Sequence, residues 1–485
     1  MMTLKHTLRA SVALCFLVAI QGCASLKNRV LPSSEPPLPK SYSGSGGGVN
    51  TAAVTWRSFF KDPNLASLIR EALDNNQELN ILMQEIQVAN AEVKARKGAI
   101  FPFLTFGGGA GVEKVGRYTR PGAVEANTEI KPGKEFPEPL PAFGFSADFD
   151  WEVDIWRKLR NERDASIMRY LATQEGRNFM IMNLVAEIAE SYYELVGLDN
   201  QLQILEQTIS VQQDALKAVK MQKDAAKVTE LAVRRFEAEV LKNQSRRFSI
   251  KQNITVVENR LNFLAGRYPQ PISRNSAGFE KQSLPSVHAG LPAQLLSYRP
   301  DVRQAELELA ASGLDVKAAG ARFYPALNIK AALGLESFTL GSLFSTPEGL
   351  LYGAAANMMA PLINKSAIRA EFNSASARQI AAIYSYQQAV LKAYIEVVNQ
   401  MAQMRNLNSG LNLKQQQVAA LSDSIRISGQ LFNSARADYT EVLLTQRDAL
   451  EAKIDLIELK QQQMTAYIKA YKALGGGIDR ADSKK

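Results

Sequence analysis

Residues 143–154 of this chain are Phe-Gly-Phe-Ser-Ala-Asp-Phe-Asp-Trp-Glu-Val-Asp, an unbroken alternation of apolar side chains with small or polar ones. Successive side chains of a β-strand point to opposite faces, so this period of two predicts a strand over about 142–154 with one apolar face. Similar alternation predicts strands over about 103–115 and 326–337. A fourth strand is predicted over about 351–361, where both faces are apolar.

Strands with one apolar and one polar face are typical of membrane β-barrels. On this interpretation, the face that contacts lipid includes Phe143, Phe145, Phe149 and Trp151. A half-buried sheet in a soluble protein would show the same alternation and remains an alternative at this point. Single-chain membrane barrels need about eight strands. Four strands per chain therefore predict that several subunits share one barrel.

An internal repeat sets the architecture. Glu-Val-Lys-Ala at 92–95, followed by Phe-Pro-Phe-Leu at 101–104, recurs as Asp-Val-Lys-Ala at 315–318, followed by Tyr-Pro-Ala-Leu at 324–327. Each half is therefore predicted to form one helix–strand–strand–helix–helix unit. The first repeat is placed at 56–290 and the second at 291–477, with a C-terminal tail at 478–485.

The N-terminus predicts the compartment. Lys5 and Arg9 precede an apolar run, Ala10 to Ile20, that is too short to cross a bilayer and is typical of a signal peptide, placed at 1–22. The run ends in Ile-Gln-Gly-Cys, which resembles a lipobox with an imperfect fit at the glutamine, so Cys23 is the predicted lipidation site and mature N-terminus. An unmodified cysteine is the alternative.

The residues after Cys23 extend this prediction. Residues 23–55 are rich in Pro, Gly and Ser and lack periodicity, which predicts a lipidated tether. Ala24 follows the cysteine, rather than the aspartate that retains lipoproteins in the inner membrane, so the resemblance to sorted lipoproteins implies the outer membrane as the location. The other cysteine, Cys15, would leave with the signal peptide, so no disulfide is expected.

Long helices are predicted from two proline-free stretches, 142–268 and 362–485. Apolar residues from Leu184 to Val219, and again from Val390 to Leu421, follow the heptad rhythm of coiled coils. A helix over 157–223 would extend about 100 Å, several times the roughly 30 Å hydrocarbon core, so the helices are expected to project into the periplasm. An earlier helix is predicted to start after Asp62 and to run to about Lys97.

Composition argues against an enzyme. The only histidines are His6 and His288, and no Walker loop, metal-ligand spacing or Ser-His-Asp arrangement is found, so no catalytic residue, metal or cofactor is predicted. The formal charge of +9 falls to +7 without Lys5 and Arg9, and the remaining charges are scattered. Nucleic acid is therefore not an expected partner.

Three motifs resemble one protein family. They are Trp-Arg-Ser-Phe-Phe-Lys-Asp-Pro-Asn-Leu at 56–65, Arg-Pro-Asp-Val-Arg-Gln-Ala-Glu at 299–306 and Tyr-Lys-Ala-Leu-Gly-Gly-Gly at 471–477. They are similar to motifs of the outer membrane factors, the TolC-like and NodT-type efflux lipoproteins. The resemblance implies a mainly α-helical fold with transmembrane β-strands: a homotrimer sharing a twelve-stranded β-barrel above a twelve-helix periplasmic coiled-coil barrel.

The resemblance also implies a function and partners. It predicts the outer-membrane channel of a tripartite efflux pump or secretion system, a passive duct serving multidrug or other export. The implied partners are a periplasmic adaptor (membrane fusion) protein, an inner-membrane transporter and outer-membrane lipids. The alternative is a lipid-anchored coiled-coil structural protein of the envelope, without a pore.

A periplasmic gate is expected where the long helices of each half meet, near 223–231 and 432–444. By resemblance, the second turn carries the constriction, and the candidates are Arg436, Asp438, Tyr439, Glu441 and Leu444. The chain departs from the family pattern with Ala435 at a common glycine position and Leu444 at a frequent aspartate position. An apolar ring can gate by dewetting and an acidic ring can select cations. The alternative role for Leu444 is plain coiled-coil packing.

Overall fold

The computed structural model describes residues 31–33, 38–42, 51–282, 284, 287–361, 365–434 and 436–476. The predicted signal peptide, Cys23, most of the tether, Ala435 and the 478–485 tail lie outside these described residues. The chain divides into two compact units. The first, called the sheet unit, includes Val88–Tyr170 and Leu307–Ile383, and the second, called the hairpin unit, includes Ser34–Gln87, Leu171–Glu306 and Tyr384–Lys485.

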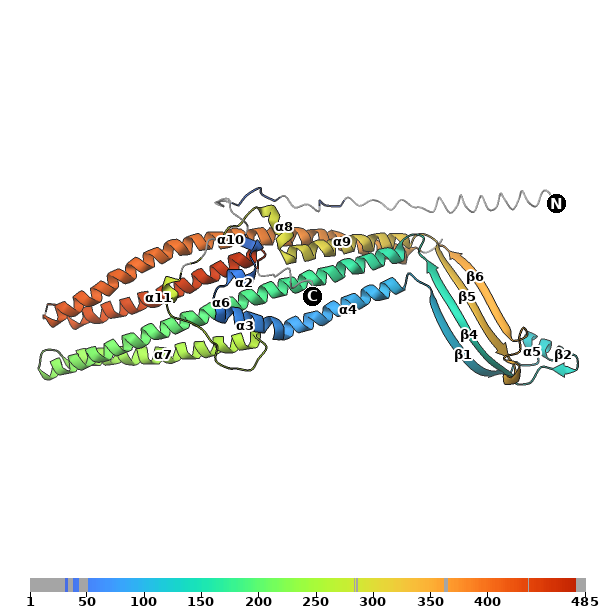
Figure 1. The fold of residues 1–485 in the computed structure, drawn as a ribbon, viewed down its shortest axis with the longest axis horizontal. Coiled ribbons are helices and arrows are strands. Elements are labelled where there is room, and N and C mark those ends of the chain that lie inside the picture. Colours follow the sequence, from blue (N-terminus) through green and yellow to red (C-terminus); the bar gives the residue numbers. More distant parts are fainter. Residues whose placement is uncertain are drawn as a thin grey trace. The chain divides into compact units, whose positions relative to one another are not determined.

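Helices and strands follow one another in the predicted order (Figure 1). The elements are η1 (Thr51–Ala53), α2 (Trp56–Phe59), α3 (Pro63–Asn75), α4 (Gln77–Gly98), β1 (Phe103–Glu113), α5 (Arg120–Glu125), β2 (Glu129–Lys131), β3 (Lys134–Glu135), β4 (Leu140–Val153), α6 (Lys158–Asp224), α7 (Glu230–Leu264), η2 (Phe279–Lys281), η3 (Pro292–Gln294), α8 (Leu295–Tyr298), α9 (Pro300–Ala321), β5 (Ala326–Ser337), η4 (Leu340–Ser342), β6 (Leu350–Met359), α10 (Ser366–Asn433) and α11 (Tyr439–Ala473).

The two halves of the chain are built alike, which confirms the predicted internal duplication. Helices α4 and α9 each have 22 residues, and both lead into a strand. After the second strand of each half come α6 with 67 residues and α10 with 68. The closing helices α7 and α11 each have 35 residues. Matching lengths in matching order are expected when one unit has been duplicated.

The four long strands form one antiparallel sheet in the order β1-β4-β5-β6. The strands lie side by side in Figure 1, with the short hairpin β2–β3 and α5 beyond one end of the sheet. The predicted strands at about 103–115, 142–154, 326–337 and 351–361 correspond to β1, β4, β5 and β6. Strands β1 and β6 are the edges, and each has unpaired backbone groups along one side.

The prediction of a single helix from about Asp62 to Lys97 is wrong, because the helix is interrupted at Asn76. The backbone of Asn76 is extended, with ψ of 125°, and separates α3 from α4. The Asn76 side chain accepts a hydrogen bond from the N–H of Leu79 at 3.0 Å, as an N-cap does, and donates to the Leu264 carbonyl at 3.0 Å. The break is therefore held by a contact with the end of α7.

The heptad positions of the first half form the core of the hairpin unit. Those that are buried in α6 are Leu184, Ile188, Ser191, Leu195, Leu198, Leu205, Ile209, Gln212 and Val219. In α10 the buried members are Val390, Ala393, Val397 and Leu411, whereas Gln400, Met404 and Lys414 are only partly buried. Within one chain, the heptad positions of α10 are thus more accessible than those of α6. None of the helices in the described parts of the chain has the length and low polarity of a membrane-crossing helix.

The sequence motifs at 56–65 and 299–306 hold the hairpin unit together. Asp62 accepts hydrogen bonds from the N–H groups of Asn64 and Leu65 at the start of α3, and from the Tyr192 hydroxyl at 2.8 Å. Arg299 is buried and pairs with Asp301 at 2.6 Å and Glu396 at 2.7 Å. Because buried charges must be paired, these motifs serve the fold rather than a reaction.

Candidate functional site

The apolar face of the sheet continues across all four strands. Residues directly opposite one another in a ladder lie on the same face. Phe145 lies opposite Gly108 on β1 and Leu335 on β5, and Leu335 in turn lies opposite Leu350 on β6. The predicted lipid-facing residues Phe143, Phe145, Phe149 and Trp151 share this face, together with Leu104, Phe106, Ile329, Leu333 and Tyr352.

Aromatic rings reinforce this face. The Phe145 ring centroid lies 6.0 Å from that of Phe106 on β1 and 5.9 Å from that of Phe344, which follows η4. Phe106 and Phe344 are themselves exposed, at 77% and 71%. An accessible apolar surface of this kind is a contact surface for lipid or protein rather than for water.

The opposite face of the sheet carries small and charged side chains. Asp150 on β4 lies opposite Lys330 on β5, and the Lys330 Nζ is 3.1 Å from the Asp150 carboxylate. The Ser146 hydroxyl donates to Asp148 at 2.7 Å on the same face. Thr105 and Gly107 on β1 lie opposite Asp148 and Ser146. One face of the sheet thus carries apolar side chains and the other carries small and charged ones, as the alternation in the sequence predicted.

Aromatic residues missed by the sequence reasoning lie at the helical end of the sheet. Trp156 stacks on Tyr324, with ring centroids 4.7 Å apart, and its indole N–H donates to the Pro325 carbonyl at 2.7 Å. The indole N–H of Trp151 donates to the Ile100 carbonyl at 3.0 Å. Membrane barrels carry aromatic girdles at both interfaces. The signal that could have found Tyr324 is its place in the repeated aromatic-Pro motif.

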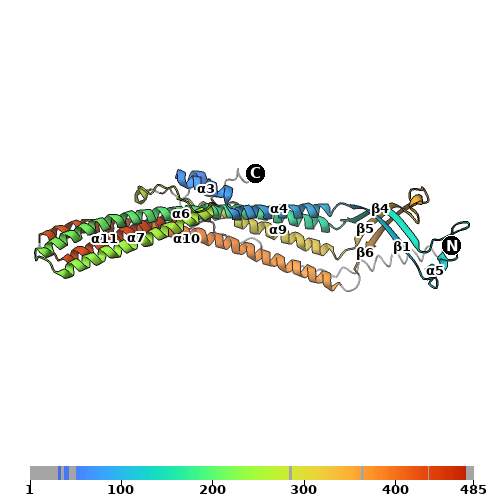
Figure 2. The same ribbon diagram turned by 90° about the horizontal axis from the view of Figure 1, so that it is seen from below.

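The turns of the two helical hairpins are packed together, as Figure 2 shows for α6, α7, α10 and α11. Near the α6–α7 turn, Val219, Val233 and Phe236 are buried in one apolar cluster. Partly buried residues of the second hairpin that pack against this cluster are Phe432, Tyr439 and Leu443. The two predicted gate regions, near 223–231 and 432–444, therefore lie in contact within one chain.

Ion pairs close the first turn. Glu230, the first residue of α7, lies 2.9 Å from the Lys223 ammonium and 2.8 Å from the Arg234 guanidinium. The hydrogen bond from Lys223 and its positive charge lower the pKa of Glu230, while that bond raises the pKa of Lys223. A carboxyl with a lowered folded-state pKa stabilises the turn at neutral pH, and that contribution is lost as the pH falls and Glu230 becomes protonated.

Of the predicted gate residues at the second turn, one packs against the first hairpin and the others are exposed. Tyr439 packs against the cluster at the turns. Arg436, Asp438 and Glu441 are exposed, and Asp438 precedes α11 and accepts a hydrogen bond from the Thr440 hydroxyl at 3.2 Å. Leu444 is 43% exposed, whereas its neighbour Leu443 packs against the cluster. Within one chain, the packing position is therefore that of Leu443.

Leu444 also lines a groove between α7 and α11. The groove has a volume of about 350 Å³, and the residues around it include Arg235, Glu239, Lys242, Thr440, Leu444 and Arg447. Three of these are basic and one is acidic. Basic side chains therefore outnumber acidic ones around Leu444.

Comparison with known proteins identifies the family. The model of the outer membrane efflux protein family matches residues 68–267 and again 291–476. The chain is 28% identical over 471 residues to the cation efflux system protein CusC of Escherichia coli strain K12, covering 96% of this chain and 98% of that protein. It is 26% identical over 474 residues to the solvent efflux pump outer membrane protein SrpC of Pseudomonas putida, covering 96% and 98%.

The fold is also that of a solved channel. The crystal structure of the open state of the MtrE outer membrane channel of Neisseria gonorrhoeae superposes with a TM-score of 0.81 at 21% identity, covering 93% of this chain and 99% of that one. Since the family model covers both repeats of the chain and the relatives match it over nearly their full length, the chain belongs to the outer membrane efflux protein family and is an outer-membrane channel component of an efflux system, not an enzyme.

Proposed function

We propose that three copies of the chain assemble into a passive export duct whose β-strands cross the outer membrane. The observation that carries this proposal is a four-stranded sheet with one continuous apolar face and two open edges. Four strands cannot close a barrel alone, because the smallest single-chain membrane barrels have about eight. Copies that join β1 to β6 would satisfy both edges.

In this assembly, Phe143, Phe145, Phe149 and Trp151 face the lipid and the Asp150–Lys330 side of the sheet lines the water-filled interior. Trp156 and Tyr324 then form part of the periplasmic aromatic girdle. Acyl chains on Cys23 add a second anchor to the membrane. The long helices project into the periplasm as a coiled-coil barrel.

The periplasmic gate lies at the packed turns of the two hairpins. Exposed Leu444 side chains of three copies converge to form an apolar constriction, and Glu441 contributes an acidic ring. Packing of Tyr439 and Leu443 against the first hairpin keeps the second hairpin in place.

The duct works with an adaptor protein and an inner-membrane transporter, which supplies the energy. The relatives are named for different cargoes, cations for CusC and solvents for SrpC. We therefore assign cargo choice to the transporter rather than to the duct.

Single-channel recording of the purified protein in a planar bilayer tests this proposal. We expect long-lived conducting events from a form of the protein that chemical cross-linking identifies as a trimer. Phe145→Arg protein, which should insert poorly, serves as the control. A trimer without conductance would favour the alternative, a coiled-coil structural protein of the envelope.

A further inference from the structure

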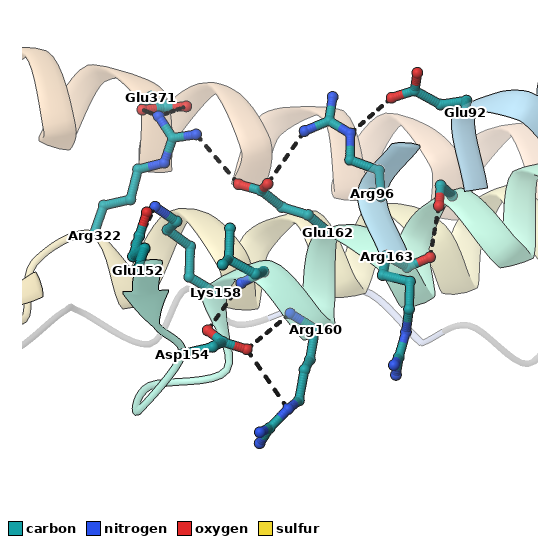
Figure 3. A network of polar contacts seen from close by, with 12 residues as sticks. Glu92, Arg96, Glu152, Asp154, Lys158, Arg160, Glu162, Arg163, Arg322 and Glu371 are labelled. Atoms are coloured by element: carbon teal, nitrogen blue, oxygen red, sulfur yellow. Dashed lines mark hydrogen bonds and ion pairs between the residues drawn. The ribbon is translucent and has the colours of Figure 1, made fainter. Parts of the chain in front are cut away.

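Four charged side chains form a continuous series across four helices of the sheet unit, α4, α6, α9 and α10 (Figure 3). Arg96 on α4 lies 3.2 Å from Glu162 on α6. Glu162 also lies 3.4 Å from Arg322 on α9, and Arg322 lies 2.6 Å from Glu371 on α10. All four side chains line one cavity of about 650 Å³. They therefore share one side of these helices.

The order of the charges follows the order of the strands. Helix α4 leads into β1, β4 leads into α6, α9 leads into β5, and β6 leads into α10. The sheet order β1-β4-β5-β6 hence gives the helix order α4, α6, α9, α10, and along it the charges alternate as positive, negative, positive, negative. Each of the three ion pairs joins helices that are neighbours in this order.

The two ends of the series belong to the two edges of the sheet. Arg96 is on the helix of edge strand β1, and Glu371 is on the helix of edge strand β6. Their side chains are 47% and 45% exposed, while Glu162 and Arg322 inside the series are 18% and 42% exposed. Arg96 also pairs with Glu92 of its own helix at 2.7 Å. Each end thus offers an accessible charge whose sign is opposite to that of the other end.

We infer that Glu371 of one copy pairs with Arg96 of the next copy, so that the series closes into one ring of alternating charges around the trimer. The inference rests on the proposed trimer. When β6 of one copy joins β1 of the next, α10 and α4 of the two copies become neighbours, like every other adjacent pair in the series. A head-to-tail ring of this kind repeats one interface at each junction.

A second copy of the chain is the partner that fits both an open sheet edge and the charge at that end of the series. It supplies an edge strand for the open backbone groups and, on the helix joined to that strand, the opposite charge. Reversed joining, β1 to β1 or β6 to β6, would bring like charges together, which disfavours wrong pairing. The ring therefore specifies which edges meet.

Cysteine cross-linking in the full-length chain tests the junction. Arg96→Cys and Glu371→Cys are combined in one chain and treated in membranes with a short bis-maleimide, and denaturing gels are read. Covalent dimers and trimers are expected from the double variant, and none from either single variant. When chains with only Arg96→Cys and chains with only Glu371→Cys are co-expressed, the ladder should stop at dimers.

The matched control is Arg169→Cys with Asp315→Cys, an ion pair that joins α6 to α9 inside one chain. It should cross-link without forming any species larger than one chain. A native trimer in which Arg96→Cys and Glu371→Cys cross-link only within one chain, to another protein or not at all would overturn the inference while leaving the trimer intact. Loss of the native trimer itself, in the unmodified protein, would overturn the proposed function and the inference together.

A second measurement does not depend on cysteines. Glu371→Gln should lower the temperature at which trimers dissociate, and the difference should shrink at high salt, because the Debye length falls from about 10 Å at 0.1 M to about 3 Å at 1 M. Asp315→Asn, which breaks a pair inside one chain, should leave trimer dissociation unchanged. An equal, salt-independent effect of the two variants would contradict the inference.

Discussion

Leu444 and Glu441 lie three residues apart near the start of α11, and both are exposed in the single chain. Residues at this spacing lie on the same helix face, so both can point toward the axis of a trimer. Their chemistry differs: a ring of leucines closes a pore by excluding water, and a ring of carboxylates attracts cations.

We expect Leu444→Ser to raise the resting conductance, because hydroxyl groups let water into the constriction. Glu441→Gln should weaken cation selectivity without opening the pore. Leu413→Ser is the matched control, since Leu413 is an exposed leucine of α10, at 67%, outside the turn. Bilayer recordings that show both conductance and selectivity unchanged in the two variants would place the gate elsewhere.

Cys23, which lies outside the described residues, is the residue that we expect to carry the lipid anchor. Cys23→Ala should abolish labelling with palmitate, because the thiol that carries the acyl chain is gone. The barrel should still insert, since its apolar strand face does not depend on the lipid. Palmitate labelling that persists in Cys23→Ala would disprove the predicted lipidation site.

At the scale of the elements, substitutions can test the two faces of the sheet separately. An arginine on the lipid face of a barrel costs about 2–4 kcal/mol at the midplane. Phe145→Arg or Phe149→Arg should therefore reduce the amount of trimer in membranes. Asp148→Asn, on the opposite face, should have little effect. Equal losses from both kinds of change would show that the faces are wrongly assigned.

Close contact between β4 and β5 gives a second prediction for the sheet. A Cβ added at Gly334 would lie 2.5 Å from the Phe145 carbonyl oxygen, so Gly334→Ala forces the strands apart. Overpacking of this kind typically costs about 1–3 kcal/mol. Gly109→Ala is the control, because a Cβ there meets nothing within 4 Å. The heat-dissociation temperature of the trimer should fall for Gly334→Ala only.

At the scale of the whole molecule, we expect the proposed adaptor to dock at the packed turns of the two hairpins. Phe236 is buried in the cluster at the turns, and its truncation to alanine should cost about 3–5 kcal/mol locally. Because the turns are far along the chain from the strands, Phe236→Ala should keep the trimer but lose co-purification of the adaptor and transporter. Phe248→Ala, at an exposed position of α7, should retain both partners. Partner recovery that is unaffected by Phe236→Ala would contradict docking at the turns.

The sequence by itself determined the four long strands, the long helices and the internal duplication. The alternation at 143–154 fixed which residues of β4 share a face, because the period of a strand is a local property. Proline-free heptad stretches predicted α6 and α10 for a similar reason. The motifs at 56–65 and 299–306 identified the family, although their residues, such as Asp62 and Arg299, turn out to hold the fold.

Only the tertiary structure decided the features that join distant parts of the chain. The helix breaks at Asn76 because its side chain bonds to Leu264, 188 residues away. Tyr439 proves to be a packing residue because the first hairpin lies against it. The charge series depends on which helices are neighbours, and the order of the strands sets that arrangement. No local pattern contains this information, since contacts between distant residues arise only when the sheet and the hairpins have formed.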